Sequence, residues 1–149
     1  CLSRGLGDVY KRQVLVGGAG PRRTPRLAAT YASEFNVPFR SMDETAAAFA
    51  RVRDACAAAG RDSSSMRYSL AQPVCCGRDK AELERRAGAI GIPLSRLRAE
   101  GIAGTPAEVV DRLGQFGEIG AQSVYLQVLD LHDIDHLELI AAEVMPQVA

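Results

Sequence analysis

This sequence of 149 residues has no excess of charge of either sign and no long apolar run. It carries 18 Lys or Arg and 18 Asp or Glu, so its formal net charge is zero. Nucleic-acid binding depends on a basic surface, and the sequence has no basic excess. No apolar run approaches the roughly 20 residues that a membrane-spanning helix needs. The composition therefore predicts a globular protein with neither nucleic acid nor a membrane as its partner.

Cysteine and its usual metal-binding patterns are also scarce. Three of the 4 cysteines, Cys56, Cys75 and Cys76, lie outside the first 13 residues. An odd number with two adjacent residues makes a poor disulfide framework and is typical of a reducing compartment, so we expect a cytoplasmic protein. No Cys-x-x-Cys or Cys/His pair has zinc spacing, so no metal site is predicted. Cys75 and Cys76 end an apolar run and are interpreted as buried packing.

The N-terminal segment differs in kind from the rest of the chain. Residues 3–13, SRGLGDVYKRQ, resemble the in-frame translation of a transposase adaptor oligonucleotide used in shotgun DNA sequencing. Foreign segments take no part in a fold, so we interpret residues 1–13 as non-native and residues 14–149 as the native part. A genuine basic N-terminal arm is the alternative. Without residues 1–13, 15 basic and 17 acidic residues remain, a balance of about −2. The natural protein is expected to extend further upstream.

A short apolar run that opens into glycines is the most informative stretch. Residues 14–16 predict a buried strand, and residues 17–20 read Gly-Gly-Ala-Gly. Glycines allow close backbone approach and positive φ, and Pro21 suits the first turn of a helix. A strand that leads through glycines to a helix N-terminus is a ready anion site, because free N–H groups and the helix dipole point the same way. The stretch predicts a phosphate-binding turn, with a plain strand-to-helix connection as the alternative.

Strands and helices alternate along the rest of the chain. Two S/T-x-x-E capping boxes, Ser41 with Glu44 and Thr105 with Glu108, open two of the helices. Hydrophobic spacing predicts four strands, at residues 14–16, 34–37, 66–74 and 123–129. It predicts helices, caps included, at residues 22–33, 41–59, 79–90, 94–99, 105–119 and 133–144. Successive strand–helix units favour a parallel sheet covered by helices.

Four such units leave two α/β architectures open, a doubly wound sheet and part of a (β/α)8 barrel. A Rossmann unit needs three glycines and an acid about 20 residues later. Arg23 stands where the third glycine should be, and the strand at 34–37 ends without an acid. The Rossmann alternative is therefore weak. In a barrel, phosphate sites lie at the C-terminal ends of strands, which is where residues 17–20 lie.

Several other polar residues have more than one interpretation. His132 and His136, with aspartates around them, could form a metal site, but acids in a first helical turn favour a solvated helix that carries both histidines. Gln72 and Gln127 lie in the middle of strands, where they either face a barrel lumen or are satisfied structural amides.

Two arginine pairs are also ambiguous from the sequence. Arg22–Arg23 either adds charge to the phosphate site or is solvated. Arg85–Arg86 is expected on a solvated helix face.

Three longer stretches resemble a known family in their order and spacing. They are VLVGGAGPRRTPRLAATYASEFNVPF at 14–39, TPAEVVDRL at 105–113 and SVYLQVLDLHDIDHLELIAAEVMPQV at 123–148. They resemble the C-terminal half of a luciferase-like monooxygenase, and more narrowly the branch that uses the deazaflavin coenzyme F420. The resemblance implies that residues 14–149 form the C-terminal half of a TIM-like (β/α)8 barrel, with about four βα units.

The resemblance also implies site residues by position. The family's phosphate-binding turn corresponds to Gly17, Gly18, Ala19 and Gly20. Their backbone N–H groups would hold the cofactor phosphate, and Asn36 matches the asparagine that ends the next strand in relatives. Pro25 departs from the family's leucine. Since proline inside a helix costs about 3 kcal/mol, the helix is expected to begin at Thr24 rather than Pro21.

The implied reaction is hydride transfer between coenzyme F420 and a small organic substrate, with flavin mononucleotide (FMN) as the alternative cofactor. A second copy of the parent chain is a further candidate partner. No catalytic residue is assigned, because the groups that contact ring and substrate are expected in the N-terminal half. This chain alone is expected to be inactive and aggregated or partly molten, since an open half-barrel leaves strand edges unpaired. A Rossmann-like nucleotide-binding domain and a non-enzymatic interaction domain are the rival classes.

Overall fold

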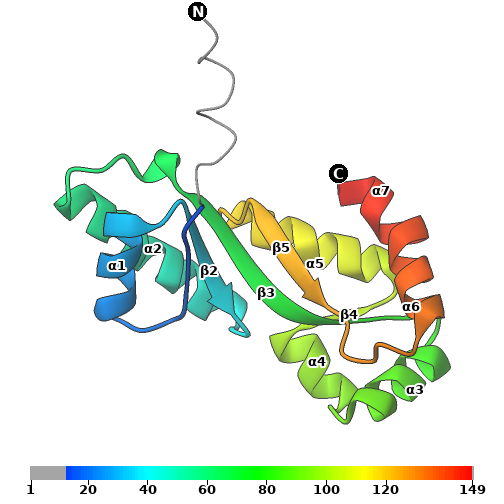
Figure 1. Cartoon of the computed structure of the whole chain (residues 1–149). Helices are drawn as coiled ribbons and strands as arrows, with labels where there is room; N and C mark the ends of the chain where they lie inside the picture. The colour runs from blue at the N-terminus through cyan, green and yellow to red at the C-terminus, as the bar shows by residue number, and fades with distance from the viewer. Residues whose placement is uncertain (1–12, 149) are drawn as a thin grey trace, which may run out of the picture.

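The computed structural model describes residues 13–148. The expected adaptor-derived segment, residues 1–13, lies outside the described residues except for Gln13. Figure 1 shows a twisted sheet of strands with helices packed along it. In the described part of the chain, no helix is long and apolar enough to cross a membrane.

The five strands of the described residues run parallel. They are β1 (Leu15–Gly17), β2 (Glu34–Pro38), β3 (Arg67–Cys76), β4 (Ile102–Gly104) and β5 (Ser123–Gln127). β2 lies between β1 and β3, and β5 pairs with the opposite edge of β3 at residues 69–73. β4 pairs with residues 74–76 at the end of β3. The four predicted strands are confirmed, but β4 was missed because its sequence, Ile-Ala-Gly, has no β-branched apolar run like the one that predicts β1.

The helices begin close to their predicted caps. Both capping boxes are formed, with the side chain of each member bonded to the backbone of the other. The α-helices are α1 (Arg23–Tyr31), α2 (Met42–Ala58), α3 (Lys80–Ile90), α4 (Leu94–Glu100), α5 (Pro106–Glu118), α6 (Ile134–Leu139) and α7 (Met145–Val148). A π-helical turn, η2 (Ile140–Val144), joins α6 to α7, and a 3-10 turn, η1 (Ser63–Ser65), precedes β3.

The strand order favours the barrel over the doubly wound sheet. Strands β1, β2, β3 and β5 follow one another across the sheet in chain order, without the reversal that a doubly wound sheet has at its ligand crevice. Helices α1, α2 and α5 contribute Ala28, Phe49 and Phe116 to one core cluster on the sheet. A sequential parallel sheet covered by its connecting helices is the arrangement found in a (β/α)8 barrel.

Residues along each strand alternate between two faces of the sheet, and one face forms the core. Phe35, Tyr68 and Leu70 lie on this face and are buried. The ring of Phe49 from α2 is fully buried, with its centroid 6.3 Å from that of Phe35 and 5.3 Å from that of Tyr68. Both contacts are edge-to-face, the geometry that aromatic pairs prefer.

The opposite face carries polar side chains, and we call it the polar face. The register pairs Asn36 with Ser69 and Ala71 with Tyr125, so these side chains leave the sheet on the same side. The polar residues on this face are Glu34, Asn36, Arg67, Ser69, Ser123, Tyr125 and Gln127. Leu15 and Tyr125 are 49% and 46% exposed, so no described helix covers this part of the sheet.

We expect Phe49→Ala to lower the free energy of unfolding of the whole protein by about 3–5 kcal/mol, because it empties a fully buried ring site. Phe39→Ala is the matched control. Phe39 is 51% exposed, so its loss is expected to be within about 1 kcal/mol. Urea denaturation followed by circular dichroism measures both changes. Equal losses would contradict a core between α2 and the sheet.

Candidate functional site

The predicted phosphate-binding turn follows β1 at the carboxyl edge of the sheet. Gly18 has a φ of 137°, a left-handed conformation that favours glycine. Its N–H donates a hydrogen bond of 3.0 Å to the carbonyl oxygen of Asn36. This bond ties the turn to β2, and it means that the Gly18 N–H is already used within the protein. Any anion would be held by the other N–H groups of the turn.

Two backbone N–H groups in the turn have no acceptor among residues 13–148, those of Ala19 and Gly20. Both residues are half-buried. A Cβ at Gly20 would lie 2.9 Å from Oγ1 of Thr24, so a side chain there would collide with α1. The turn is a small cradle in which Gly18 adopts a φ that favours glycine and two N–H groups have no acceptor among the described residues.

Helix α1 begins directly after this turn. It starts at Arg23, one residue before the expected Thr24. Pro25 lies in the first turn, where a missing N–H removes no helical hydrogen bond. No acidic residue lies in that first turn and no side chain caps it within the described residues. The free N–H groups and the positive end of the helix dipole are therefore both available next to the glycines.

The nearby arginines line a different surface. Arg22, Arg23 and Arg26 border a cavity of about 420 Å³ together with Leu27, Thr30 and Tyr31. No residue of the 17–20 turn borders this cavity. The arginines add positive charge near the turn, but their side chains do not line it.

Asn36 lies beside the turn, paired in register with Gly17. It is only 8% exposed, and its Nδ2 donates a hydrogen bond of 2.9 Å to Oγ of Ser69. Ser69 in turn donates to Oε1 of Glu34 at 2.6 Å, and the Tyr125 phenol donates to the same oxygen at 2.9 Å. The structure places the turn next to Asn36, and Glu34, Ser69 and Tyr125 lie beside them. The alternating polar positions in these strands were the available signal.

The two mid-strand glutamines face opposite sides of the sheet. Gln127 pairs with Pro73 and lies on the polar face. Gln72 pairs with Leu126 on the core face, is fully buried, and donates from Nε2 to the carbonyl oxygen of Arg40. Gln72 is therefore a core amide that is satisfied at Nε2 but has no partner for its Oε1 among the described residues, and Gln127 is the glutamine that faces the polar side.

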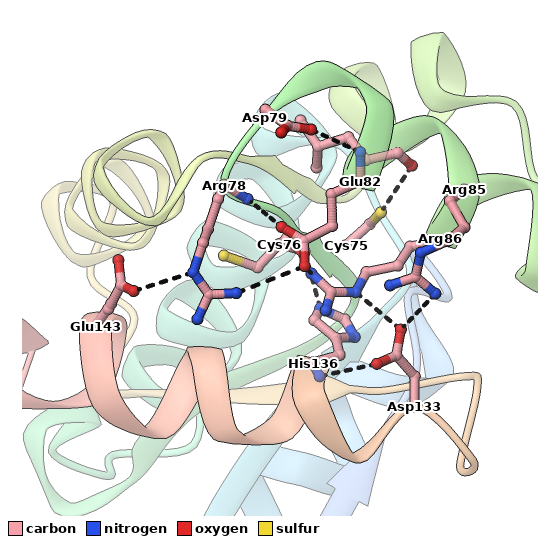
Figure 2. A network of polar contacts seen from close by, with 11 residues as sticks. Cys75, Cys76, Arg78, Asp79, Glu82, Arg85, Arg86, Asp133, His136 and Glu143 are labelled. Carbon is pink, nitrogen blue, oxygen red and sulfur yellow. Dashed lines mark hydrogen bonds and ion pairs between the residues drawn. The ribbon is translucent and has the colours of Figure 1, made fainter.

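A second polar cluster joins the end of β3 to helices α3 and α6 (Figure 2). The Arg86 side chain is only 2% exposed, so the expectation of a solvated face was wrong for Arg86. Its Nε lies 2.9 Å from Oδ2 of Asp133, and its Nη1 lies 2.8 Å from Oε1 of Glu82 and 2.6 Å from the carbonyl oxygen of Cys76. The side chain of Arg85 is 57% exposed, as expected. Helical spacing gave no signal that one of two adjacent arginines turns inward.

His136 also lies inside this cluster, which corrects its expected position on a solvated helix. It is 4% exposed, and its Nε2 accepts a hydrogen bond of 2.9 Å from the N–H of Cys76. Burial, and then the positive charge of Arg86, lower the pKa of His136 below its usual value. Its ring is thus neutral and holds the end of β3 as an acceptor. Among residues 13–148, no group of three or more His, Cys, Asp or Glu side chains is arranged to hold a metal ion.

The cysteines at the end of β3 are buried, as predicted, and their thiols are free. Burial raises the pKa of Cys75 and raises that of Cys76 to about 11. A thiol with so high a pKa is neutral near pH 7 and is a poor nucleophile or metal ligand. These thiols are packing groups next to Arg86.

The sequential parallel sheet with a glycine turn at its carboxyl edge defines a barrel-type α/β protein. The chain belongs to the luciferase-like monooxygenase family, whose model matches residues 5–100. No curated protein matches the sequence.

Solved structures of similar fold are distant in sequence. An F420-dependent secondary alcohol dehydrogenase, solved with an F420–acetone adduct, has a TM-score of 0.77 at 14% identity, over 94% of this chain and 50% of its own. The coenzyme F420-dependent tetrahydromethanopterin reductase of Methanopyrus kandleri has a TM-score of 0.71 at 16% identity, over 91% of this chain and 50% of its own. The oxygenating constituent of 3,6-diketocamphane monooxygenase from Pseudomonas putida, in complex with FMN, has a TM-score of 0.62 at 18% identity, over 91% of this chain and 48% of its own. The chain spans about half the length of these relatives.

We expect Arg86→Met to lower the free energy of unfolding by about 3 kcal/mol, because it leaves the Asp133 carboxylate without its buried partner. The matched control is Arg85→Met, which removes the longer contact (3.4 Å) of an exposed arginine with the same Asp133 carboxylate and should cost about 0–1 kcal/mol. Denaturant unfolding of the whole protein measures both. Similar losses of unfolding free energy for Arg86→Met and Arg85→Met would show that the buried position of Arg86 does not add to stability.

The lowered pKa of His136 predicts a stability that falls in mild acid. The unfolded state takes up a proton near the ordinary value of about 6.5, whereas the folded state resists it. Stability should therefore be full above about pH 6.5 and decline as the pH falls from there toward the folded-state pKa. Unfolding free energies measured between pH 7.5 and 5.5 test this.

The histidine variants identify the source of that decline. His136→Gln keeps an acceptor but cannot titrate, so its decline should be smaller than in the wild type. His132→Gln, at an exposed position, should behave as the wild type. A decline that survives unchanged in His136→Gln would assign the effect to other groups.

Proposed function

We propose that the whole protein is an oxidoreductase that binds coenzyme F420 and transfers hydride between this deazaflavin and a small organic substrate. Membership of the luciferase-like monooxygenase family supports an enzyme of this kind. One solved structure of similar fold is described as an F420-dependent alcohol dehydrogenase. In this proposal residues 14–149 are the C-terminal half of the barrel and hold the cofactor phosphate. The free thiols of the described residues support a reducing, cytoplasmic location.

The single observation that carries the proposal is that the N–H groups of Ala19 and Gly20 have no acceptor among the residues that the structure describes. They lie at the carboxyl edge of a parallel sheet, where ligands of barrel enzymes bind. The uncapped N-terminus of α1 adds a favourable dipole for an anion. The glycine at position 20 leaves open the space that a Cβ would fill against Thr24. These residues fit a phosphate group, with Gly18 supporting the turn through Asn36 instead of donating to the ligand.

The deazaflavin ring supplies the hydride chemistry when it is bound. The residues of this chain bind and orient: the turn holds the phosphate, and the polar face beside it offers the amide of Asn36. We assign no catalytic residue to the chain, because the groups that contact the ring and the substrate are expected in the N-terminal half of the barrel.

FMN is the second candidate cofactor. A solved structure of similar fold contains FMN, and FMN also carries a phosphate at the end of a ribityl chain. The turn recognises the phosphate and therefore suits either molecule. Titrations with both cofactors separate the two.

We expect Gly18→Asp to weaken cofactor binding by at least tenfold, about 1.4 kcal/mol, because it adds a negative charge beside the phosphate. Gly18→Ala is the matched control. Both variants strain the left-handed φ at this position, so the difference between them isolates the charge. Fluorescence titration of the whole protein with F420 and with FMN gives the dissociation constants.

The charge effect should also depend on salt. We expect the gap between the Asp and Ala variants to narrow as ionic strength rises, because salt screens the repulsion. A wild-type protein that binds neither cofactor, or equal binding by the two variants at low salt, would contradict an anion site in this turn.

A further inference from the structure

Three side chains on the polar face form a directed chain of hydrogen bonds. Asn36 Nδ2 donates to Ser69 Oγ at 2.9 Å, and Ser69 Oγ donates to Glu34 Oε1 at 2.6 Å. All three are buried, at 8%, 0% and 9% exposure. They come from two adjacent strands, β2 and β3, so their backbone positions are held by the sheet.

The direction of this chain follows from the number of protons available. Ser69 has one hydroxyl proton. Its short bond to Glu34 uses that proton, and the Tyr125 phenol donates to the same Glu34 oxygen, which acts as an acceptor for both. Ser69 can therefore offer Asn36 only a lone pair. An Asn36 amide turned the other way would bring its oxygen against the Ser69 oxygen without a proton between them.

Among residues 13–148, the oxygen of the Asn36 amide has no hydrogen-bond donor. In the described residues no donor meets Oδ1 of Asn36, and this atom is not among the buried polar atoms that lack a partner. Asn36 is 8% exposed and lies on the polar face, beside Gly17 in register. Its position next to the phosphate-binding turn makes it an acceptor for a ligand held there.

We propose that Glu34 and Ser69 are positioning residues that lock the Asn36 amide, so that its oxygen accepts a hydrogen bond from a hydroxyl or ring N–H of the bound cofactor. This inference rests on the proposed function, because it takes the ligand to be a ribityl-bearing flavin or deazaflavin. Glu34 and Ser69 act through Asn36 and do not touch the ligand. The backbone bond from Gly18 to Asn36 is separate from this side-chain chain.

The test is fluorescence titration of the whole protein with F420 and with FMN. We expect Asn36→Ala and Ser69→Ala each to weaken binding about three- to tenfold, the effect of one well-placed hydrogen bond. The double variant should bind no more weakly than Asn36→Ala alone, because Ser69 acts only through Asn36. Lys80→Ala, at an exposed position of α3, is the control and should change binding less than twofold.

Conservative replacement at Glu34 separates positioning from general stability. Glu34→Gln keeps the oxygen that accepts from Ser69 and Tyr125, so it should bind within about twofold of the wild type. Glu34→Ala removes that oxygen and should match Ser69→Ala. Thermal unfolding of every variant reports stability separately. If Ser69→Ala does not fold, Ser69→Cys takes its place, since a thiol has nearly the same volume and is a poor acceptor.

The outcomes distinguish the two proposals. A wild type that binds neither cofactor overturns the proposed function and, with it, the ligand of Asn36. A wild type that binds, with Ser69→Ala binding equally well, overturns the positioning role alone. Additive losses in the double variant also overturn it, because they mean that Ser69 and Asn36 act independently.

Discussion

The parallel register of β2 and β5 on β3 is the constraint on which the rest of the structure depends. Because side chains alternate along a strand, this one register sends Phe35 and Leu70 toward the helices and Asn36 and Ser69 to the opposite face. A shift by one residue would exchange the two sets. The helix-packed core and the polar face are thus two consequences of the same pairing, and the glycine turn is attached to it through the Gly18–Asn36 bond.

The two buried polar clusters have different roles and lie at the two ends of β3. The chain from Asn36 to Glu34 lies beside the turn and leaves one oxygen free for a ligand. The cluster around Arg86 has its charges paired by Glu82 and Asp133 and ties β3 to α3 and α6. Buried charges require such partners, which suits the second cluster to holding the structure together.

Local signals predicted much of the fold. The two capping boxes, four of the five described strands and the glycine turn follow from short-range chemistry that the structure retains. The burial of Arg86 and His136 could not be predicted, since each has its partners on another element, as with the Cys76 N–H that lies 60 positions from His136. Sequence spacing also could not say that Gln72 faces the core and Gln127 the polar face, because that depends on which face of each strand the helices cover.

The sequence by itself determined where strands and helices begin, that a glycine turn follows the first strand, and which family the chain resembles. Only the tertiary structure decided which N–H groups of the turn are free and which way the Asn36 amide points. The physical reason is that capping and periodicity act within a few residues, whereas a hydrogen-bond donor is free or used according to what another strand brings to it. The Gly18 N–H is used in a hydrogen bond to β2, and the Asn36 amide is oriented by its hydrogen bond to Ser69 on β3.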